Sequence, residues 1–306
     1  MVRGPIVQAR VVSRLKTGAL IVSTVALLTA PAVTAPGQQR ARHEMTGMVL
    51  RIDAAKRSVV ISHDAVRGLM PAMTMPFEVR DVKELNGLAP GAIVSFTLVL
   101  AKETSHIEHV NVVRYQSVEQ DPLTARRLQL LRTITGAAPK PLPVGDAVPE
   151  FTLTNQLRKP VSLSQFRGKV VAVNFIYTSC VLPQFCYRVA NHFGVVRDRF
   201  RDRMGRDVVL LTITFDPARD TPEKLAEYGS HWKADPAVWH FLTGAAPDVE
   251  RVCNLFGVEF FADEGLMNHS VRTAVLDRSG RLVANIEGNQ YTAAQLGDLV
   301  ETVLRR

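Results

Sequence analysis

Short segments in which apolar and polar residues alternate fill residues 44–113. Turn residues such as Asn86-Gly87 and Pro90-Gly91 separate them. The alternating segments are, in chain order, GMVLRID, RSVVISH, TMPFEV, IVSFTLVL and IEHVNVV. Alternation with a period of two residues is the pattern of a strand, and five short strands close together are typical of antiparallel barrels. The pattern therefore predicts a small all-β barrel in this part of the chain.

From residue 144 to residue 306 the pattern changes to strands that alternate with helices. Two nearly continuous apolar runs, KVVAVNFIYT and DVVLLTITF, predict strands that are buried on both faces. Helical periodicity is found in TPEKLAEYGSHW, PDVERVCNLFG and TAAQLGDLVETVLRR, whereas SVRTAVLD and RLVANIEG predict a hairpin. This region is therefore predicted to be an α/β domain with a mixed sheet.

Residues 116–143 join the two regions. Within them, DPLTARRLQLLRTI carries leucines at helical spacing behind a capping Asp121, and GAAPKPLP is a stiff stretch that contains prolines. We expect a helical connector followed by a linker.

Residues 1–32 have the features of an export signal. Basic residues precede TGALIVSTVALLTA, an apolar run of about 14 residues that is shorter than the roughly 20 needed to span a bilayer. Ala30-Pro31-Ala32 fits a cleavage site, so we expect a signal peptide, with a retained inner-membrane anchor as the alternative. In both cases the chain is predicted to be exported to the periplasm.

Composition and charge narrow the class of protein. A chain of 306 residues suggests two domains, and 46% hydrophobic residues are enough for two cores. The net charge is +8, but residues 1–32 carry four basic and no acidic side chains, so the remaining 33 basic and 29 acidic residues give only +4. A nucleic-acid partner is therefore not expected. Three cysteines exclude a disulfide scaffold and leave room for one functional pair and one odd thiol.

Methionine and histidine are concentrated in the segment SHDAVRGLMPAMTMPF. Met73 and Met75 lie two residues apart, so both side chains face the same way on a strand, and His63 ends the preceding strand. Two thioethers and an imidazole suit Cu(I) or Ag(I) far better than zinc or magnesium. The alternative is that the methionines fill a core and that His63 lies on the surface.

The sequence motif HD…MPAMTMPF makes residues 44–115 resemble the CusF-like periplasmic copper-binding domain. The resemblance implies a five-stranded, OB-like barrel and a copper site made of His63, Met73 and Met75. Met70 stands where that family places a tryptophan over the metal. It is therefore either a further sulfur ligand or a sign that the site is open.

Cys180 and Cys186 follow a buried strand and begin a helix in NFIYTSCVLPQFCYRVANHF. The partial positive charge of a helix N-terminus favours the thiolate, which is the form that binds a soft metal or attacks a disulfide. Pro183 between them favours a loop that folds back. The spacing is not the C-x-x-C of thioredoxins, and by itself it leaves a structural disulfide or two unrelated buried thiols open.

The segments VGDAVPEFTLTNQ, VSLSQFRGKVVAVNFIYTSC, ITFDPARDTPEKL and MNHSVRTAVLDRSG together resemble the Sco/SenC family over nearly all of residues 144–306. The resemblance implies a thioredoxin-like α/β fold and delivery of copper to the dinuclear copper centre of cytochrome c oxidase. It also implies three copper ligands, Cys180, Cys186 and His269. Asp216 matches an acid near the site and is expected to support it from outside the ligand set.

Three positions depart from the family. Five residues rather than three separate the cysteines, Tyr187 follows Cys186 in place of a proline, and Asn268 precedes the histidine in place of an aspartate. The third cysteine, Cys253, is predicted by periodicity to be a buried structural thiol.

The leading interpretation is a periplasmic copper metallochaperone rather than an enzyme. The barrel would capture Cu(I), and the thioredoxin-like domain would hold copper, as Cu(I) or Cu(II), and pass it to the cytochrome c oxidase subunit that carries the dinuclear copper centre. Two alternatives remain. The cysteine pair, cycling through a disulfide with periplasmic thiol reductants, would make a thiol-disulfide reductase, and the barrel alone would fit copper sequestration or efflux.

Overall fold

The computed structural model describes residues 41–102, 104–113, 122–135, 140–263 and 266–306. The chain divides into two units, Met1–Gln39 and Arg40–Arg306, and everything described belongs to the second unit. The predicted signal peptide or anchor lies outside the described residues. Among the helices that are described, none has the length and apolar character needed to cross a bilayer.

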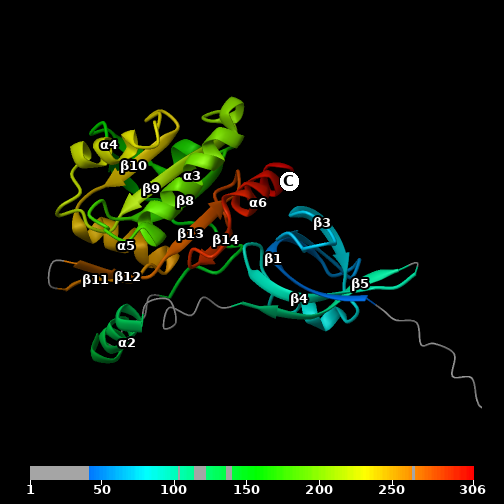
Figure 1. The fold of residues 1–306 in the computed structure, drawn as a ribbon. Helices are drawn as coiled ribbons and strands as arrows, with labels where there is room; N and C mark the ends of the chain where they lie inside the picture. Colours follow the sequence, from blue (N-terminus) through cyan, green and yellow to red (C-terminus); the bar gives the residue numbers. More distant parts are fainter. Residues whose placement is uncertain (1–40, 103, 114–121, 136–139, 264–265) are drawn as a thin grey trace, which may run out of the picture. The chain divides into compact units, whose positions relative to one another are not determined.

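The N-terminal sheet domain (residues 41–113) is a single antiparallel sheet of five strands (Figure 1). The strand order across the sheet is β3-β2-β1-β4-β5, with a short 3-10 helix, η1, between β3 and β4. The elements are β1 (Ala41–Asp53), β2 (Ser58–His63), β3 (Met73–Glu78), η1 (Val82–Leu85), β4 (Ile93–Leu100) and β5 (Ser105–Val112).

The two edge strands of this sheet, β3 and β5, do not form a ladder in the described residues. They meet at one isolated parallel bridge between Val79 and Ile107, where the amide of Arg80 donates to the Ile107 carbonyl at 3.0 Å. Immediately afterwards Asp81 caps η1, so the chain leaves the sheet before a second pair can form. The sheet is therefore five-stranded and antiparallel as predicted, but the prediction of a closed barrel is wrong for the residues described.

A glycine lets β1 and β2 approach closely at the end of β2. A Cβ atom on Gly47 would lie 2.6 Å from Ile61 Cγ2 and 2.8 Å from His63 Cα. Because such distances are not tolerated, only glycine allows His63 to sit at this position. The core beneath the sheet includes Val49, Ile61, Phe77, Phe96, Leu98 and Ile107.

The C-terminal domain (residues 140–306) is built on a seven-stranded mixed sheet with the order β14-β13-β8-β9-β10-β6-β7. Its strands are β6 (Thr152–Asn155), β7 (Pro160–Ser162), β8 (Val170–Ile176), β9 (Val208–Thr214), β10 (Trp239–Thr243), β13 (Arg272–Leu276) and β14 (Leu282–Glu287). A separate hairpin consists of β11 (Phe260–Asp263) and β12 (Leu266–His269).

Helices surround this sheet and connect its strands. The longer ones are α3 (Arg188–Arg199), α4 (Pro222–Ser230), α5 (Ala246–Phe256) and α6 (Ala293–Leu304), with α2 (Pro122–Thr135) before the domain, and the short ones are η2 (Leu163–Phe166), η3 (Pro183–Tyr187) and η4 (Arg201–Arg203). Thr221 caps α4, and Thr292 and Gln295 form a reciprocal capping box on α6.

The two central strands explain the continuous apolar runs in the sequence. Every residue of β8 and of β9 is buried, and the two strands pair in parallel from Val170 with Val208 to Ile176 with Thr214. A parallel pair covered by helices has no face left for polar side chains. This buried pair brings the loop that follows β8 to the end of the sheet where the cysteines lie.

A buried histidine in this domain makes its stability depend on pH. His192 on α3 is 7% exposed, its ring centroid lies 5.0 Å from that of Tyr291, and burial lowers its pKa to about 4. An unfolded chain binds a proton at this side chain near pH 6.5. Stability is therefore fully present above pH 6.5 and is lost as the pH falls towards 4, by about 2–3 kcal/mol.

His192→Phe should remove this part of the pH dependence, whereas His231→Gln, a change at an exposed histidine, should not. Both tryptophans, Trp232 and Trp239, lie in the C-terminal domain, so their fluorescence during urea unfolding reports on it. Unfolding is compared at pH 7 and pH 4.5. An unchanged loss of stability in His192→Phe would show that the buried imidazole is not its source.

Candidate metal centre

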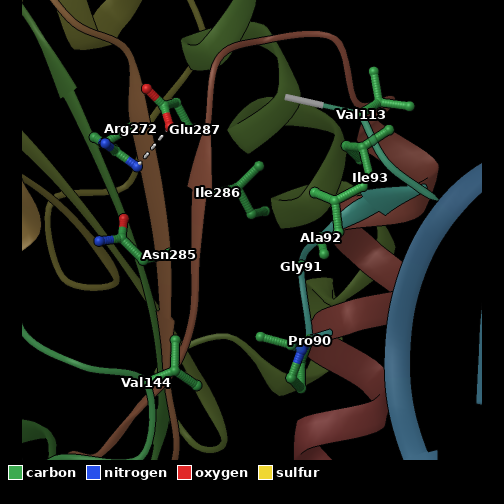
Figure 2. A pocket seen from close by; sticks show the side chains of 12 residues that line it. Pro90, Gly91, Ala92, Ile93, Val113, Val144, Arg272, Asn285, Ile286 and Glu287 are labelled. Carbon is green, nitrogen blue, oxygen red and sulfur yellow. Dashed lines mark ion pairs between the residues drawn. The ribbon is translucent and has the colours of Figure 1, made fainter. Parts of the chain in front are cut away.

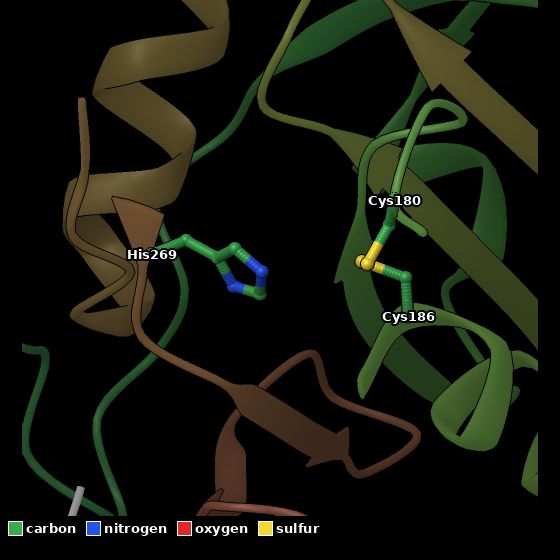
Figure 3. A group of neighbouring side chains, drawn as sticks. All are labelled: Cys180, Cys186 and His269. Carbon is green, nitrogen blue, oxygen red and sulfur yellow. The ribbon is translucent and has the colours of Figure 1, made fainter. Parts of the chain in front are cut away.

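Cys180, Cys186 and His269 form one cluster in the C-terminal domain. Their ligand atoms, two sulfurs and an imidazole nitrogen, all lie within 4.8 Å of one another. Figure 3 shows the two sulfurs side by side and the ring of His269 directed towards them. All three cysteines of the chain, including Cys253, are free thiols in the structure. The structure thus brings together the residues that the sequence predicted as a copper site.

The five-residue spacing between the cysteines is accommodated by a tight turn. The amide of Cys180 donates to the Tyr177 carbonyl at 3.3 Å, and the amide of Phe185 donates to the Leu182 carbonyl at 3.1 Å. Pro183 then begins η3, a π-helical turn that contains Cys186 and runs directly into α3. The longer loop therefore folds back on itself, and Cys186 still faces Cys180.

His269 reaches the cysteines from the end of β12, far away in sequence. Its Nδ1 lies 3.0 Å from the Ser270 carbonyl oxygen. A carbonyl only accepts hydrogen bonds, so Nδ1 carries the proton and Nε2 keeps its lone pair. The ring is held among aromatic side chains, with centroid distances of 4.8 Å to Phe215, 5.6 Å to Tyr177 and 6.1 Å to Phe185.

The two thiols of the cluster differ in protonation. A hydrogen bond from Cys186 lowers the pKa of Cys180 to about 4. Burial, together with the neighbouring Cys180, raises the pKa of Cys186 well above its usual range. At neutral pH the site therefore holds one thiolate and one thiol. A metal ion bound by both sulfurs would release the proton of Cys186.

Asp220 holds the loop that leads to Cys180. This carboxylate is fully buried, and it accepts hydrogen bonds from the amide and the hydroxyl of Thr178, at 3.0 and 2.5 Å, and from the hydroxyl of Thr214 at 2.5 Å. Thr178 stands two residues before Cys180, and Thr214 ends β9. Sequence reasoning missed Asp220. The available signal was its place directly before the Thr221 cap, within the same DPARDTP motif as Asp216.

Asp216, which the sequence singled out, has different contacts. Its carboxylate pairs with Arg219, whose Nε lies 2.5 Å away, and its amide donates to the Thr214 hydroxyl. It is the neighbour in sequence of Phe215, which packs on His269.

The remaining residues that the sequence analysis singled out in this domain are Tyr187, Asn268 and Cys253. Tyr187 is exposed, and its ring centroid lies 5.4 Å from that of Trp232. Asn268 is buried beside His269. Cys253 lies on α5 within the core, as its periodicity predicts, and burial raises the pKa of its thiol.

The structure places His63, Met73 and Met75 on adjacent strands of the N-terminal sheet domain. His63 pairs with Met73, and Met75 pairs with Ile61, so these side chains share one face of β2 and β3. Met73 is 45% exposed, whereas Met75 is half-buried. Met70 lies in the preceding loop, where it forms a bridge with Val66.

The ring of His63 has the tautomer in which Nε2 keeps its lone pair. It is 1% exposed, and its Nδ1 lies 2.8 Å from the Asp64 carbonyl oxygen, to which it must donate. Its Nε2 is buried and has no hydrogen-bond partner among the described residues. A buried lone pair without a partner beside two thioethers fits a soft metal ion.

Comparison with protein families divides the chain at the same place as the fold. A family model described as SCO1/SenC matches residues 140–305, which is more than half of the chain. A second, described as copper binding periplasmic protein CusF, matches residues 42–112.

Individual relatives match the C-terminal part. Protein sco1 of Schizosaccharomyces pombe is 28% identical over 154 residues, which cover 48% of this chain and 56% of that protein. The chain thus spans little more than half the length of that relative. Among solved structures, copper-bound ScoI of Arabidopsis thaliana has a TM-score of 0.46 and 24% identity, covering 53% of this chain and 100% of its own. BsSco, described as a member of the Sco family of cytochrome c oxidase assembly proteins, has a TM-score of 0.46 and 24% identity, covering 54% and 96%.

Proposed function

Because the chain belongs to the SCO1/SenC family, we propose that it is an exported metallochaperone that delivers copper to the dinuclear copper centre of cytochrome c oxidase. The observation that carries the proposal is the cluster of Cys180, Cys186 and His269, whose ligand atoms lie within 4.8 Å of one another. Sco proteins are copper proteins of cytochrome c oxidase assembly, and the cluster is where this chain would hold its cargo.

The ligand atoms of the cluster, two sulfurs and an imidazole nitrogen, favour copper as the metal that is carried. Thiolate sulfur is a soft donor that favours Cu(I), and an added imidazole also suits Cu(II). Because its pKa is lowered, Cys180 is a thiolate at neutral pH even without a metal ion. Cys186 loses its proton when the ion binds. Cu(I) or Cu(II) would therefore bind to a Cys180 thiolate that exists before the metal arrives, and to Cys186, which becomes a thiolate on binding.

The N-terminal sheet domain would capture Cu(I) for the cluster. Its copper ligands would be His63, Met73 and Met75, with Met70 in the adjacent loop as a further sulfur ligand. These side chains are all neutral, and they bind Cu(I) more weakly than thiolates do. Copper should therefore move from this domain to the cysteines when they are reduced. Fusion of the two domains raises the effective concentration of one site at the other. Its CusF-like character supports a periplasmic location.

A thiol-disulfide reductase is the second candidate, and one observation favours it. Cys180 is only partly buried and has a depressed pKa, and the free thiol of Cys186 lies beside it. A low-pKa thiolate with a neighbouring thiol is the arrangement of a redox-active pair. Such an enzyme would reduce the cysteines of an apo copper site before the metal is loaded.

Replacement of His269 separates the two functions, because dithiol exchange does not need an imidazole ligand. We expect His269→Ala to slow copper transfer to an apo acceptor domain that carries a dinuclear copper site by about tenfold or more. Reduction of a disulfide substrate by the same variant should change little. His231→Ala, at an exposed histidine, is the matched control. If disulfide reduction collapses while copper transfer persists, the reductase is the correct function.

A further inference from the structure

One carboxylate on the last helix contacts both strands that carry the methionine and histidine side chains. The hydroxyls of Ser62 on β2 and Thr74 on β3 both donate to Oδ2 of Asp298 on α6, at 2.7 and 2.8 Å. Ser62 and Thr74 are direct cross-strand partners. Asp298 thus links the two strands at one point, and its own second oxygen lies 2.7 Å from the guanidinium of Arg199.

This link lies between the residues assigned to the Cu(I) site. His63 and Met73 form the next pair on one side of the Ser62–Thr74 pair, and Ile61 and Met75 form the next pair on the other. Because side chains alternate across a sheet, Asp298 holds the face opposite to the one that presents the sulfurs and the imidazole. The contact therefore fixes the spacing of the ligands without occupying their face.

A second side chain of α6 acts on the segment that orients the imidazole. Nε2 of Gln295 donates to the Ser62 carbonyl and to Oδ1 of Asp64, both at 3.2 Å. The carbonyl of Asp64 accepts the hydrogen bond from Nδ1 of His63. Gln295 is also part of the capping box of α6. Its hydrogen bonds therefore link the start of the helix to Asp64, the residue whose carbonyl orients the ring of His63.

Further residues of the two domains meet, so the contact of Asp298 is part of a larger interface. Met48 and Leu50 of β1 are fully buried in the core of the C-terminal domain. A Cβ atom on Gly91 would lie 2.9 Å from Cβ of Ala284 on β14, and Figure 2 shows Gly91 facing the neighbouring Ile286. The pocket drawn there is lined by both domains.

We propose that α6 positions the ligands of the N-terminal copper site. Docking of the N-terminal sheet domain through Asp298 and Gln295 strengthens Cu(I) binding at His63, Met73 and Met75. By linkage, Cu(I) bound there strengthens the docking. The inference rests on the proposed function, because it takes the copper ligands from there.

Docking through Asp298 would strengthen Cu(I) binding because β3, which carries Met73 and Met75, lies at the edge of the sheet. β3 is a six-residue edge strand, and among the residues that the structure describes it forms a ladder with β2 alone; Met73 is its first residue. The ends of edge strands fray unless they are tied down. A carboxylate that holds Ser62 and Thr74 together removes this freedom before the metal binds, and such preorganisation raises affinity.

The test measures Cu(I) affinity in the full chain with Cys180 and Cys186 replaced by serine, so that only the N-terminal site remains. Anaerobic competition with a Cu(I) chelator gives the dissociation constant. Asp298→Ala should weaken binding by about fivefold or more. Asp298→Asn, which keeps one acceptor oxygen, should restore part of the affinity. Glu301→Ala is the matched control, because Glu301 lies on the same helix but pairs with arginines of the C-terminal domain.

A second variant acts from the sheet side and leaves α6 intact. Thr74→Val removes one of the two hydroxyl donors at an exposed position with little change in shape. It should weaken Cu(I) binding in the presence of Asp298 but add little to Asp298→Ala, since the two changes remove the same hydrogen bond. Equal Cu(I) affinity in Asp298→Ala and Glu301→Ala would overturn this inference alone. No Cu(I) binding in the serine background with Asp298 intact would instead overturn the ligand assignment, and with it the inference.

Discussion

Simultaneous replacement of Cys180 and Cys186 with serine is expected to remove one equivalent of tightly bound Cu(I) from the reduced chain. Serine keeps the size of the side chain but cannot supply a thiolate, and the remaining imidazole of His269 is one ligand where three were available. The equivalent bound in the N-terminal sheet domain should persist. Copper is counted after anaerobic competition with a chelator.

The third cysteine provides the matched control for this experiment. Cys253 lies in the core on α5, away from the cluster, and burial raises the pKa of its thiol. Cys253→Ala should therefore lower stability slightly and leave the copper count unchanged. A double serine variant that still holds its full complement of copper would show that the cluster is not the cargo site, and the delivery model would have to be abandoned.

The order and type of the main elements could be predicted from the sequence because they follow from local patterns. Unbroken apolar runs gave the buried strands β8 and β9, and helical spacing gave α4, α5 and α6. Closure of the N-terminal sheet could not be predicted in this way. Five alternating segments say nothing about whether the edge strands pair with each other, and here the chain turns into η1 after a single bridge.

The same distinction applies to the candidate sites. Cys180 and Cys186 are visible in sequence as neighbours, but His269 joins them only through the β11–β12 hairpin, and its assignment came from family resemblance. Asp220 looks like an ordinary helix-flanking aspartate until the topology buries it. The contact of Asp298 with Ser62 spans 236 residues, a separation at which periodicity contains no information.

Asp220 is expected to matter most for the stability of the cluster's framework. Asp220→Ala leaves the amide of Thr178 and two buried hydroxyls without their acceptor. Hydrogen bonds to a buried carboxylate are worth about 1.5–3 kcal/mol each, and unpaired donors add a desolvation penalty. We expect the free energy of unfolding of the C-terminal domain to fall by about 3–5 kcal/mol. Copper affinity should fall by about 10- to 100-fold, because Thr178 no longer holds the loop before Cys180.

Urea unfolding followed by tryptophan fluorescence measures the first effect, and chelator competition measures the second. Asp220→Asn keeps one acceptor oxygen and should lie between the wild type and Asp220→Ala. The matched control is Asp216→Ala, which breaks a partly exposed ion pair with Arg219 and should cost about 1 kcal/mol or less. If Asp216→Ala weakens copper binding more than Asp220→Ala does, the carboxylate that the sequence singled out is the one that supports the site. The buried hydrogen bonds of Asp220 then serve the fold alone.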